Sequence, residues 1–260
     1  TVGLAAGLAM TGRIVFVYGI APFVTMRCFE HIRNDVCFHR AQVRLVGVGQ
    51  GLTYSGEGAT HHSRIDIGLM SALPNMTVVC PGDPHEARAA TIASIDQPGA
   101  VYLRLGKSSE PEVHTGPITP FALGRGILMQ EGAGTDAHVA LLSTGNMLPT
   151  MVSVCARLEA VGLKPTMVSM PTVKPLDEGL IDAIASPGTT FVTIEEHSHL
   201  GGLGAAVSKR VHERNLSVRV QRFALNDDYI DYAGSHDYLR ERFGLSPDAI
   251  ARAILDRLNG

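Results

Sequence analysis

The densest group of residues capable of chemistry lies between Gly49 and His62. Glycines recur through this stretch and leave Glu57, His61 and His62 as a carboxylate and two imidazoles on a flexible backbone. Such a backbone can approach a bound molecule closely, and imidazole changes its protonation near neutral pH. The stretch therefore predicts a binding or catalytic loop, with a merely solvated loop as the alternative.

A second dense group occupies residues 195–204, which read Glu-Glu-His-Ser-His-Leu-Gly-Gly-Leu-Gly. These carboxylates and imidazoles could bind a metal, but their spacing matches no zinc signature. We therefore predict no metal site and favour a role in capping the next helix or in packing at an interface. The Gly-Leu-Gly that opens this helix is weak evidence for phosphate binding, because a third glycine at the usual spacing is missing.

Alternating strands and helices must position these groups. Short apolar runs typical of buried strands are separated by segments in which apolar residues recur every three or four positions. We predict strands at 13–18, 43–48, 76–80, 101–105, 138–142, 164–170, 190–195 and 218–224. Helices are predicted at 23–36, 65–73, from residue 84 onwards, and at 149–160, 177–185, 205–214 and 246–258. This alternation implies mainly parallel sheets that are covered on both faces and bind ligands beyond the carboxyl ends of their strands.

A polar stretch at residues 106–120 has no apolar period and contains Pro111, Pro117 and Pro120. Such composition is typical of a linker between domains. We therefore predict an α/β protein of two three-layer α/β domains, at residues 1–115 and 121–260. The chain opens with Thr1 and Val2 already inside a small-residue helical pattern, so we expect this helix to lack its cap and a preceding segment to be missing.

The overall composition excludes several classes of function. The net charge of the 260 residues is −3, without runs of like charge, which argues against a nucleic-acid partner. Apolar stretches fall short of the roughly 18 to 20 residues that span a bilayer, so no membrane contact is predicted. The four cysteines form no Cys-x-x-Cys pair, and we expect reduced thiols in a cytoplasmic protein.

A series of short motifs spans almost the whole chain, at residues 2–9, 21–23, 32–35, 56–61 (GEGATH), 72–76 (ALPNM), 174–177 (KPLD), 195–198 (EEHS) and 201–204 (GGLG). In this order they resemble the transketolase family. The resemblance is closest to the C-terminal subunit of split, two-component transketolases, which carries the pyrimidine-binding domain and the C-terminal domain. A second polypeptide in such enzymes supplies the diphosphate-binding domain.

The resemblance implies thiamine diphosphate as a cofactor shared with the partner subunit. Phe23 falls on the central aromatic residue of the family's pyrimidine pocket, while Ile20 and Met26 stand at the flanking aromatic positions. His61 falls on the family histidine that hydrogen-bonds oxygens of the donor. Glu57 stands where the family has an aspartate that binds a substrate hydroxyl.

Arg104 falls on the family arginine that binds a substrate phosphate, and Gln50, in the glycine-rich stretch, is also predicted to bind substrate. The implied reaction transfers a two-carbon ketol or acyl unit from a ketose or 2-oxo acid donor to an aldehyde acceptor. The implied assembly is a self-dimer that joins the N-terminal diphosphate-binding subunit in a heterotetramer.

The sequence also departs from the family pattern. Gly49 stands where many members have a histidine, and the family glutamate that activates the cofactor would precede Thr1. The chain contains no Gly-Asp-Gly, so Mg²⁺ is expected on the partner subunit. Two alternatives stay open: the β subunit of a 2-oxo acid dehydrogenase E1 component, which shares this domain order, and a non-catalytic regulatory or assembly subunit.

Overall fold

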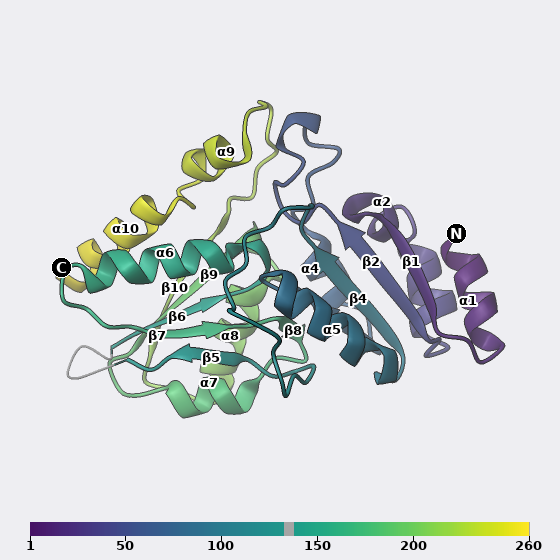
Figure 1. Cartoon of the computed structure of the whole chain (residues 1–260), viewed down its shortest axis with the longest axis horizontal. Helices are drawn as coiled ribbons and strands as arrows, with labels where there is room; N and C mark the ends of the chain where they lie inside the picture. Colours follow the sequence, from purple (N-terminus) through teal and green to yellow (C-terminus); the bar gives the residue numbers. More distant parts are fainter. Residues whose placement is uncertain (133–137, 260) are drawn as a thin grey trace.

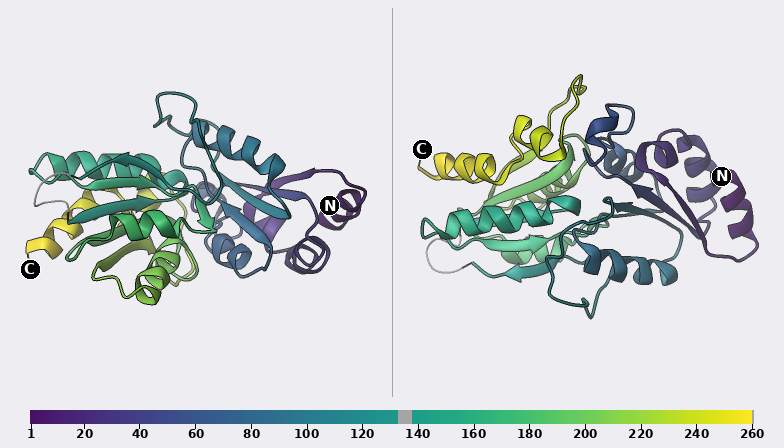
Figure 2. Two further views of the ribbon diagram at one scale, coloured as in Figure 1. Left: turned by 90° about the horizontal axis from the view of Figure 1, so that it is seen from below. Right: turned by 45° about the horizontal axis from the view of Figure 1, so that its top comes forward.

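The structure of the protein, a computed structural model, describes residues 1–132 and 138–259 and consists of two lobes (Figure 1). Each lobe is built on a five-stranded sheet. Two further views keep the lobes side by side, with the ends of the chain at opposite ends of the molecule (Figure 2). Within the described ranges, no helix combines the length and apolar character needed to cross a bilayer.

The first sheet has the strand order β1-β2-β4-β3-β8. Its strands are β1 (Val15–Ile20), β2 (Val43–Val48), β3 (Met76–Val79), β4 (Ala100–Leu105) and β8 (Thr172–Lys174). The first four pair in parallel, whereas β8 comes from later in the chain and pairs antiparallel with β3. The central strands are buried along almost their whole length because both faces of the sheet are covered.

Helices provide this cover. On one face, α1 (Val2–Met10), the π-helix η1 (Ile32–Cys37) and α4 (Asp66–Ser71) pack in one apolar cluster with β2 and β3. On the other face, α5 (Pro84–Asp96) packs against β3 and β4. α5 begins as its sequence predicts, because the Asp83 carboxylate accepts a hydrogen bond from the Glu86 amide at 2.8 Å and Pro84 occupies the first turn. Three short helices complete the lobe, α2 (Ala21–Thr25), α3 (Phe29–His31) and the 3₁₀ turn η2 (Ser55–Glu57).

The second sheet has the order β10-β9-β6-β7-β5. Its strands are β5 (Ile127–Gln130), β6 (Val139–Ser143), β7 (Thr166–Ser169), β9 (Thr190–Ser198) and β10 (Arg219–Leu225), parallel except for β5. One face is covered by α6 (Leu148–Glu159), α9 (His236–Arg242) and α10 (Pro247–Asn259). The other is covered by α7 (Glu178–Ile184) and α8 (Leu203–Glu213). The 3₁₀ turn η4 (Gly145–Met147) follows β6.

The predicted fold class is confirmed: both lobes are three-layer α/β units with mainly parallel sheets. Among the described residues, the strands β5 and β8, the helix α9 and the short 3₁₀ turns η2 and η4 were not predicted, and the helix expected at 23–36 is divided into α2, α3 and η1. The expected linker falls between β4 and β5, but β8 returns from the second half of the chain to the edge of the first sheet. The proposed domain limits, 1–115 and 121–260, stay a prediction.

Candidate active site

The glycine-rich loop and the residues assigned to cofactor lie together at the carboxyl ends of β1, β2 and β4. This is the edge of a parallel sheet at which ligands generally bind. α2 follows β1 without an intervening loop, because Pro22 sets the first helical turn directly after the strand. The loop at 49–62 follows β2, and residues 106–110 follow β4.

Three side chains of the β1–α2 corner form an apolar wall. Ile20, Phe23 and Met26 are each partly exposed, so they can contact a ligand as well as the core. The imidazole of His61 lies against the Phe23 ring, edge to face, with the ring centroids 5.0 Å apart. The guanidinium of Arg27 stacks on the same ring at 4.4 Å. The structure thus brings the predicted central aromatic residue and the predicted donor-binding histidine into contact.

The tip of the glycine-rich loop is formed by η2, which carries Glu57 on an exposed position. Gly58 follows at φ +78°, a conformation that favours glycine and turns the chain back toward the sheet. Thr60 Oγ1 lies 3.0 Å from His61 Nδ1 and fixes the orientation of this imidazole. Glu57 and His61 therefore stand on one turn, with Glu57 open to solvent and His61 facing the apolar wall.

The conformation and surroundings of Gly49 leave no space for a larger side chain. Its φ of +85° favours glycine, and a Cβ at this position would lie 2.0 Å from Cε2 of Tyr54. The Tyr54 ring thus fills the space beside residue 49, and its centroid lies 6.3 Å from that of His61. A histidine at position 49 would require Tyr54 to move.

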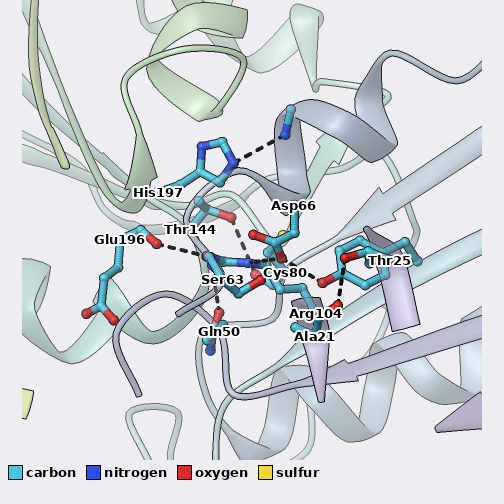
Figure 3. A network of polar contacts seen from close by, with 12 residues as sticks. Ala21, Thr25, Gln50, Ser63, Asp66, Cys80, Arg104, Thr144, Glu196 and His197 are labelled. Atoms are coloured by element: carbon cyan, nitrogen blue, oxygen red, sulfur yellow. Dashed lines mark hydrogen bonds and ion pairs between the residues drawn. The ribbon is translucent and has the colours of Figure 1, made fainter. Parts of the chain in front are cut away.

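Arg104 does not occupy the position that its predicted role requires. The side chain is 1% exposed, and its donors are committed within the protein (Figure 3). Nε donates to Asp66 Oδ2 at 2.7 Å, Nη1 to Gln50 Oε1 at 3.2 Å, and Nη2 to the carbonyls of Ser63 and Glu196 at 2.9 and 3.0 Å. This geometry argues against contact between the guanidinium and a substrate phosphate, and the assignment of Arg104 to a phosphate stays a prediction. In the structure, Arg104 joins the two lobes.

The buried partner of Arg104 is Asp66, at the start of α4. Although burial alone would raise the pKa of Asp66, the charge of Arg104 and hydrogen bonds from Arg104 and Tyr102 lower it. The Tyr102 hydroxyl donates to Asp66 Oδ2 at 2.6 Å. Asp66 is therefore ionised and forms a buried ion pair with Arg104.

A cavity of about 360 Å³ opens beside this network. Its lining includes Gln50, whose side-chain oxygen Oε1 accepts a hydrogen bond from Arg104, and Lys107, which lies just beyond the end of β4. The Lys107 ammonium is exposed and lies 5.7 Å from the centroid of the Tyr54 ring. The cation that a ligand in this cavity can reach is thus Lys107, three residues beyond the arginine that the sequence suggested.

The second dense group lies at the end of β9, between the lobes. Glu195 is buried and accepts hydrogen bonds from the amides of Leu203 and Gly204 at 2.7 and 2.8 Å, which satisfies the first turn of α8. This matches the capping interpretation and leaves those amides unavailable to a phosphate. Burial raises the pKa of Glu195 to about 7. Among the described residues, no group of three or more His, Cys, Asp or Glu side chains is arranged around a metal position.

His197 joins this group to α4. Its Nε2 accepts from the Gly68 amide at 3.3 Å, so the proton of the neutral ring must lie on Nδ1, which donates to the Ser198 carbonyl at 2.8 Å. Burial lowers the pKa of His197 to about 4. The ring is therefore neutral near pH 7 and acts as a fixed contact between the lobes.

The fold and this arrangement define a two-lobed α/β chain with a candidate ligand site at the edge of its first sheet. Residues 1–112 match the family "Transketolase, pyrimidine binding domain", and residues 132–250 match "Transketolase, C-terminal domain". The chain belongs to the transketolase family.

Some relatives of this chain are described as a subunit or a section of a transketolase. It is 31% identical over 255 residues to one subunit of the apulose-4-phosphate transketolase of Phocaeicola vulgatus, covering 98% of this chain and 80% of that protein. It is 31% identical to the putative transketolase C-terminal section of Methanocaldococcus jannaschii, covering 99% and 79%. A solved structure described as a split gene transketolase, inactive β4 tetramer, superposes with a TM-score of 0.89 at 34% identity, covering 99% and 80%. These relatives do not favour a 2-oxo acid dehydrogenase β subunit.

Sequence reasoning missed three residues of the site, Tyr54, Asp66 and Lys107. Lys107 had a detectable signal, because it follows a predicted buried strand at the edge where ligands bind. Tyr54 and Asp66 had none, since their roles depend on partners that the local pattern does not identify.

Proposed function

We propose that this chain is the C-terminal subunit of a two-subunit transketolase that requires thiamine diphosphate. The proposed reaction transfers a two-carbon ketol unit from a ketose donor to an aldehyde acceptor. The contact between Phe23 and His61 carries the proposal. It places an apolar wall suited to a flat ring directly beside an imidazole that can bond to substrate oxygens.

The residues present fit one half of the cofactor. Ile20, Phe23 and Met26 offer partly exposed apolar surface for the aminopyrimidine ring, with Phe23 supplying the aromatic contact. We assign the diphosphate and its Mg²⁺ to a partner subunit that carries the diphosphate-binding domain. When bound, thiamine diphosphate supplies the carbanion chemistry that breaks and forms the carbon–carbon bond.

His61 and Glu57 are proposed to bind the donor. A hydrogen bond from His61 to the donor carbonyl oxygen strengthens as that oxygen gains negative charge, so it lowers the barrier more than it stabilises the bound donor. Glu57, on the exposed tip of the loop, accepts a hydrogen bond from a donor hydroxyl. This contact is equal in the ground state and the transition state and therefore acts on the donor KM.

Lys107 replaces Arg104 in the proposal as the cation for an anionic substrate group. Its exposed ammonium and the cavity that it lines support this role. The relative from Phocaeicola vulgatus is named for a phosphorylated sugar. A phosphate at the far end of the donor is the group that such a lysine would meet.

The proposed assembly is a heterotetramer of two copies of this chain and two partner subunits. Apolar side chains on the outer elements of the first lobe support an interface there: Leu4 and Met10 of α1 are 70% and 57% exposed, and Tyr18 of β1 is 73% exposed. The similar structure described as an inactive β4 tetramer agrees with self-association and with a need for the partner.

Reconstitution tests this proposal. The chain is co-purified with a diphosphate-binding transketolase subunit and assayed against a panel of ketoses and 2-oxo acids. We expect ketol transfer only when both subunits, thiamine diphosphate and Mg²⁺ are present. Calorimetry on the isolated chain should show no tight cofactor binding. Micromolar Mg²⁺-dependent binding by this chain alone would overturn the two-subunit assignment, and turnover restricted to 2-oxo acids would favour the dehydrogenase alternative.

A further inference from the structure

The glycine-rich loop is closed at its base. The Ser63 amide donates to the Gly51 carbonyl at 2.8 Å, and residues 50 and 51 form β-bridges with Ser63. The loop therefore leaves and re-enters the fold at one narrow neck, as an Ω-loop does. Its tip carries Glu57 and His61, while the neck residues Gly51 and Ser63 are buried.

This neck is fixed to the second lobe as well as to its own. The side chain of Leu52 is fully buried and belongs to the apolar cluster beneath α6 and α9. Its amide donates to Glu196 Oε1 at 2.5 Å. Gly51 has φ +58°, and a Cβ there would lie 2.4 Å from the same oxygen. The approach of the neck to Glu196 therefore requires glycine at position 51.

Glu196 is in turn held by α9. His236 Nε2 lies 2.7 and 2.9 Å from its two carboxylate oxygens, and Arg240 Nε donates to Oε2 at 2.5 Å. Asn146 Nδ2 is 3.4 Å from Oε1 and 3.4 Å from Thr53 Oγ1. Burial would raise the pKa of Glu196, but the charge of Arg240 and the contact with His236 lower it. The carboxylate is ionised, fully buried and saturated with partners from both lobes.

We propose that Glu196 is a positioning residue through which the second lobe sets the donor-binding loop. Anchored by α9, it fixes the neck at Leu52 so that the tip presents Glu57 and His61 at the apolar wall. Small displacements of such groups are costly, because about 1 Å can reduce turnover 10²-fold. The inference rests on the proposed function for its effect on the donor, while the anchor itself is a property of this chain.

The chain supplies a matched control in the preceding residue. Glu195 lies on the same strand and is equally buried, but its carboxylate bonds only to the first turn of α8. Glu195→Gln and Glu196→Gln therefore remove one buried carboxylate each, and only the second touches the loop. A loss of stability alone would be common to both variants.

Hydrogen exchange and steady-state kinetics distinguish the Glu195→Gln variant from the Glu196→Gln variant. In the full chain, Glu196→Gln should increase the exchange of the Leu52 and Ser63 amides about tenfold or more, because the charged acceptor at the neck is lost. In the assembled enzyme it should lower kcat/KM for the donor by roughly 10 to 10² through both KM and kcat, with cofactor affinity within about threefold. Glu195→Gln should leave loop exchange and donor KM unchanged.

Arg240→Ala provides a second variant if Glu196→Gln does not fold. It leaves His236 to hold the carboxylate and should shift loop exchange and donor KM in the same direction by a smaller factor. If the Glu195 and Glu196 variants show equal loop exchange and equal donor KM, Glu196 does not position the loop. Ketol transfer by the wild-type complex would uphold the proposed function even in that case. If the wild-type complex transfers no ketol unit, the proposed function fails, and loop exchange in this chain alone decides whether Glu196 is the anchor.

Discussion

The buried pair of Asp66 and Arg104 predicts a large and specific loss of stability when its negative partner is removed. Asp66→Asn keeps the size of the side chain and an oxygen that can accept from Tyr102. It removes the charge that compensates the Arg104 guanidinium, which remains 1% exposed at the junction of the lobes. The perturbation is therefore one uncompensated buried cation.

The geometry sets the magnitude. The pair is fully buried, with Nε and Oδ2 2.7 Å apart, and removal of one partner from such a pair costs about 3 to 5 kcal/mol. An exposed ion pair contributes only about 0 to 1 kcal/mol. The chain offers one for comparison, Arg157 and Asp248, which are 2.5 Å apart but 39% and 70% exposed. Asp248→Asn should therefore have a small effect despite the shorter contact.

Urea unfolding followed by circular dichroism at pH 7.5 compares the two variants. Asp66→Asn should lower the free energy of unfolding by about 3 kcal/mol or more, and Asp248→Asn should lower it much less, because solvent screens the exposed pair. Replacing both members of the buried pair, as Asp66→Asn with Arg104→Met, should recover part of the loss because the stranded cation is also removed. Equal losses in the two single variants would refute the view that burial, rather than distance, decides what an ion pair contributes.

Four further outcomes are expected. His61→Ala should lower kcat/KM for the donor by roughly 10² to 10³, with cofactor affinity within about threefold. Glu57→Gln should act mainly on the donor KM. Steady-state kinetics measure the donor parameters, and calorimetry measures the cofactor affinity. Phe23→Ala should weaken cofactor binding in the assembled enzyme by about 1 to 3 kcal/mol, and a fall in melting temperature without this change would make Phe23 a core residue. Lys107→Ala should raise KM for a phosphorylated ketose more than for its unphosphorylated form, and equal effects on the two would remove Lys107 from phosphate binding. Burial in the folded chain holds the pKa of His197 at about 4, below its ordinary 6.5. The free energy of unfolding should therefore be highest above pH 6.5 and decline as the pH falls toward 4. Urea midpoints measured at pH 7.5 and pH 5 should differ less in His197→Gln than in the wild-type chain.

The sequence predicted well those features that depend on local pattern. Continuous apolar runs such as residues 43–48 indicate strands buried on both faces, and Asp83-Pro84 indicates the start of α5. β8 could not be predicted in this way, because three residues carry no measurable period and the strand forms only against β3. α9 was missed because Leu239 is its single fully buried residue.

The resemblance picked out Phe23 and His61, and both lie in segments that follow predicted strands, at the sheet edge where ligands generally bind. Arg104 was assigned to a phosphate by the family resemblance alone, which took no account of its position within β4. A cation within a strand covered on both faces must find a buried partner, and that partner, Asp66, lies 38 residues away in the sequence. Pairings of this kind are set by tertiary contacts that no local pattern reports.

The antiparallel pairing of β8 with β3 has a consequence for the synthesis of the chain. β3 ends at Val79, but β8 begins at Thr172, after β7 of the second sheet. As the polypeptide emerges from the ribosome, the first four strands of the first sheet can pair. The outer edge of β3 then stays unpaired until β8 has been synthesised. An open edge of this kind is a template for pairing with other chains. The strand that completes the first lobe is thus synthesised together with the second lobe. The two lobes therefore complete their folding as one unit, even though each has its own core.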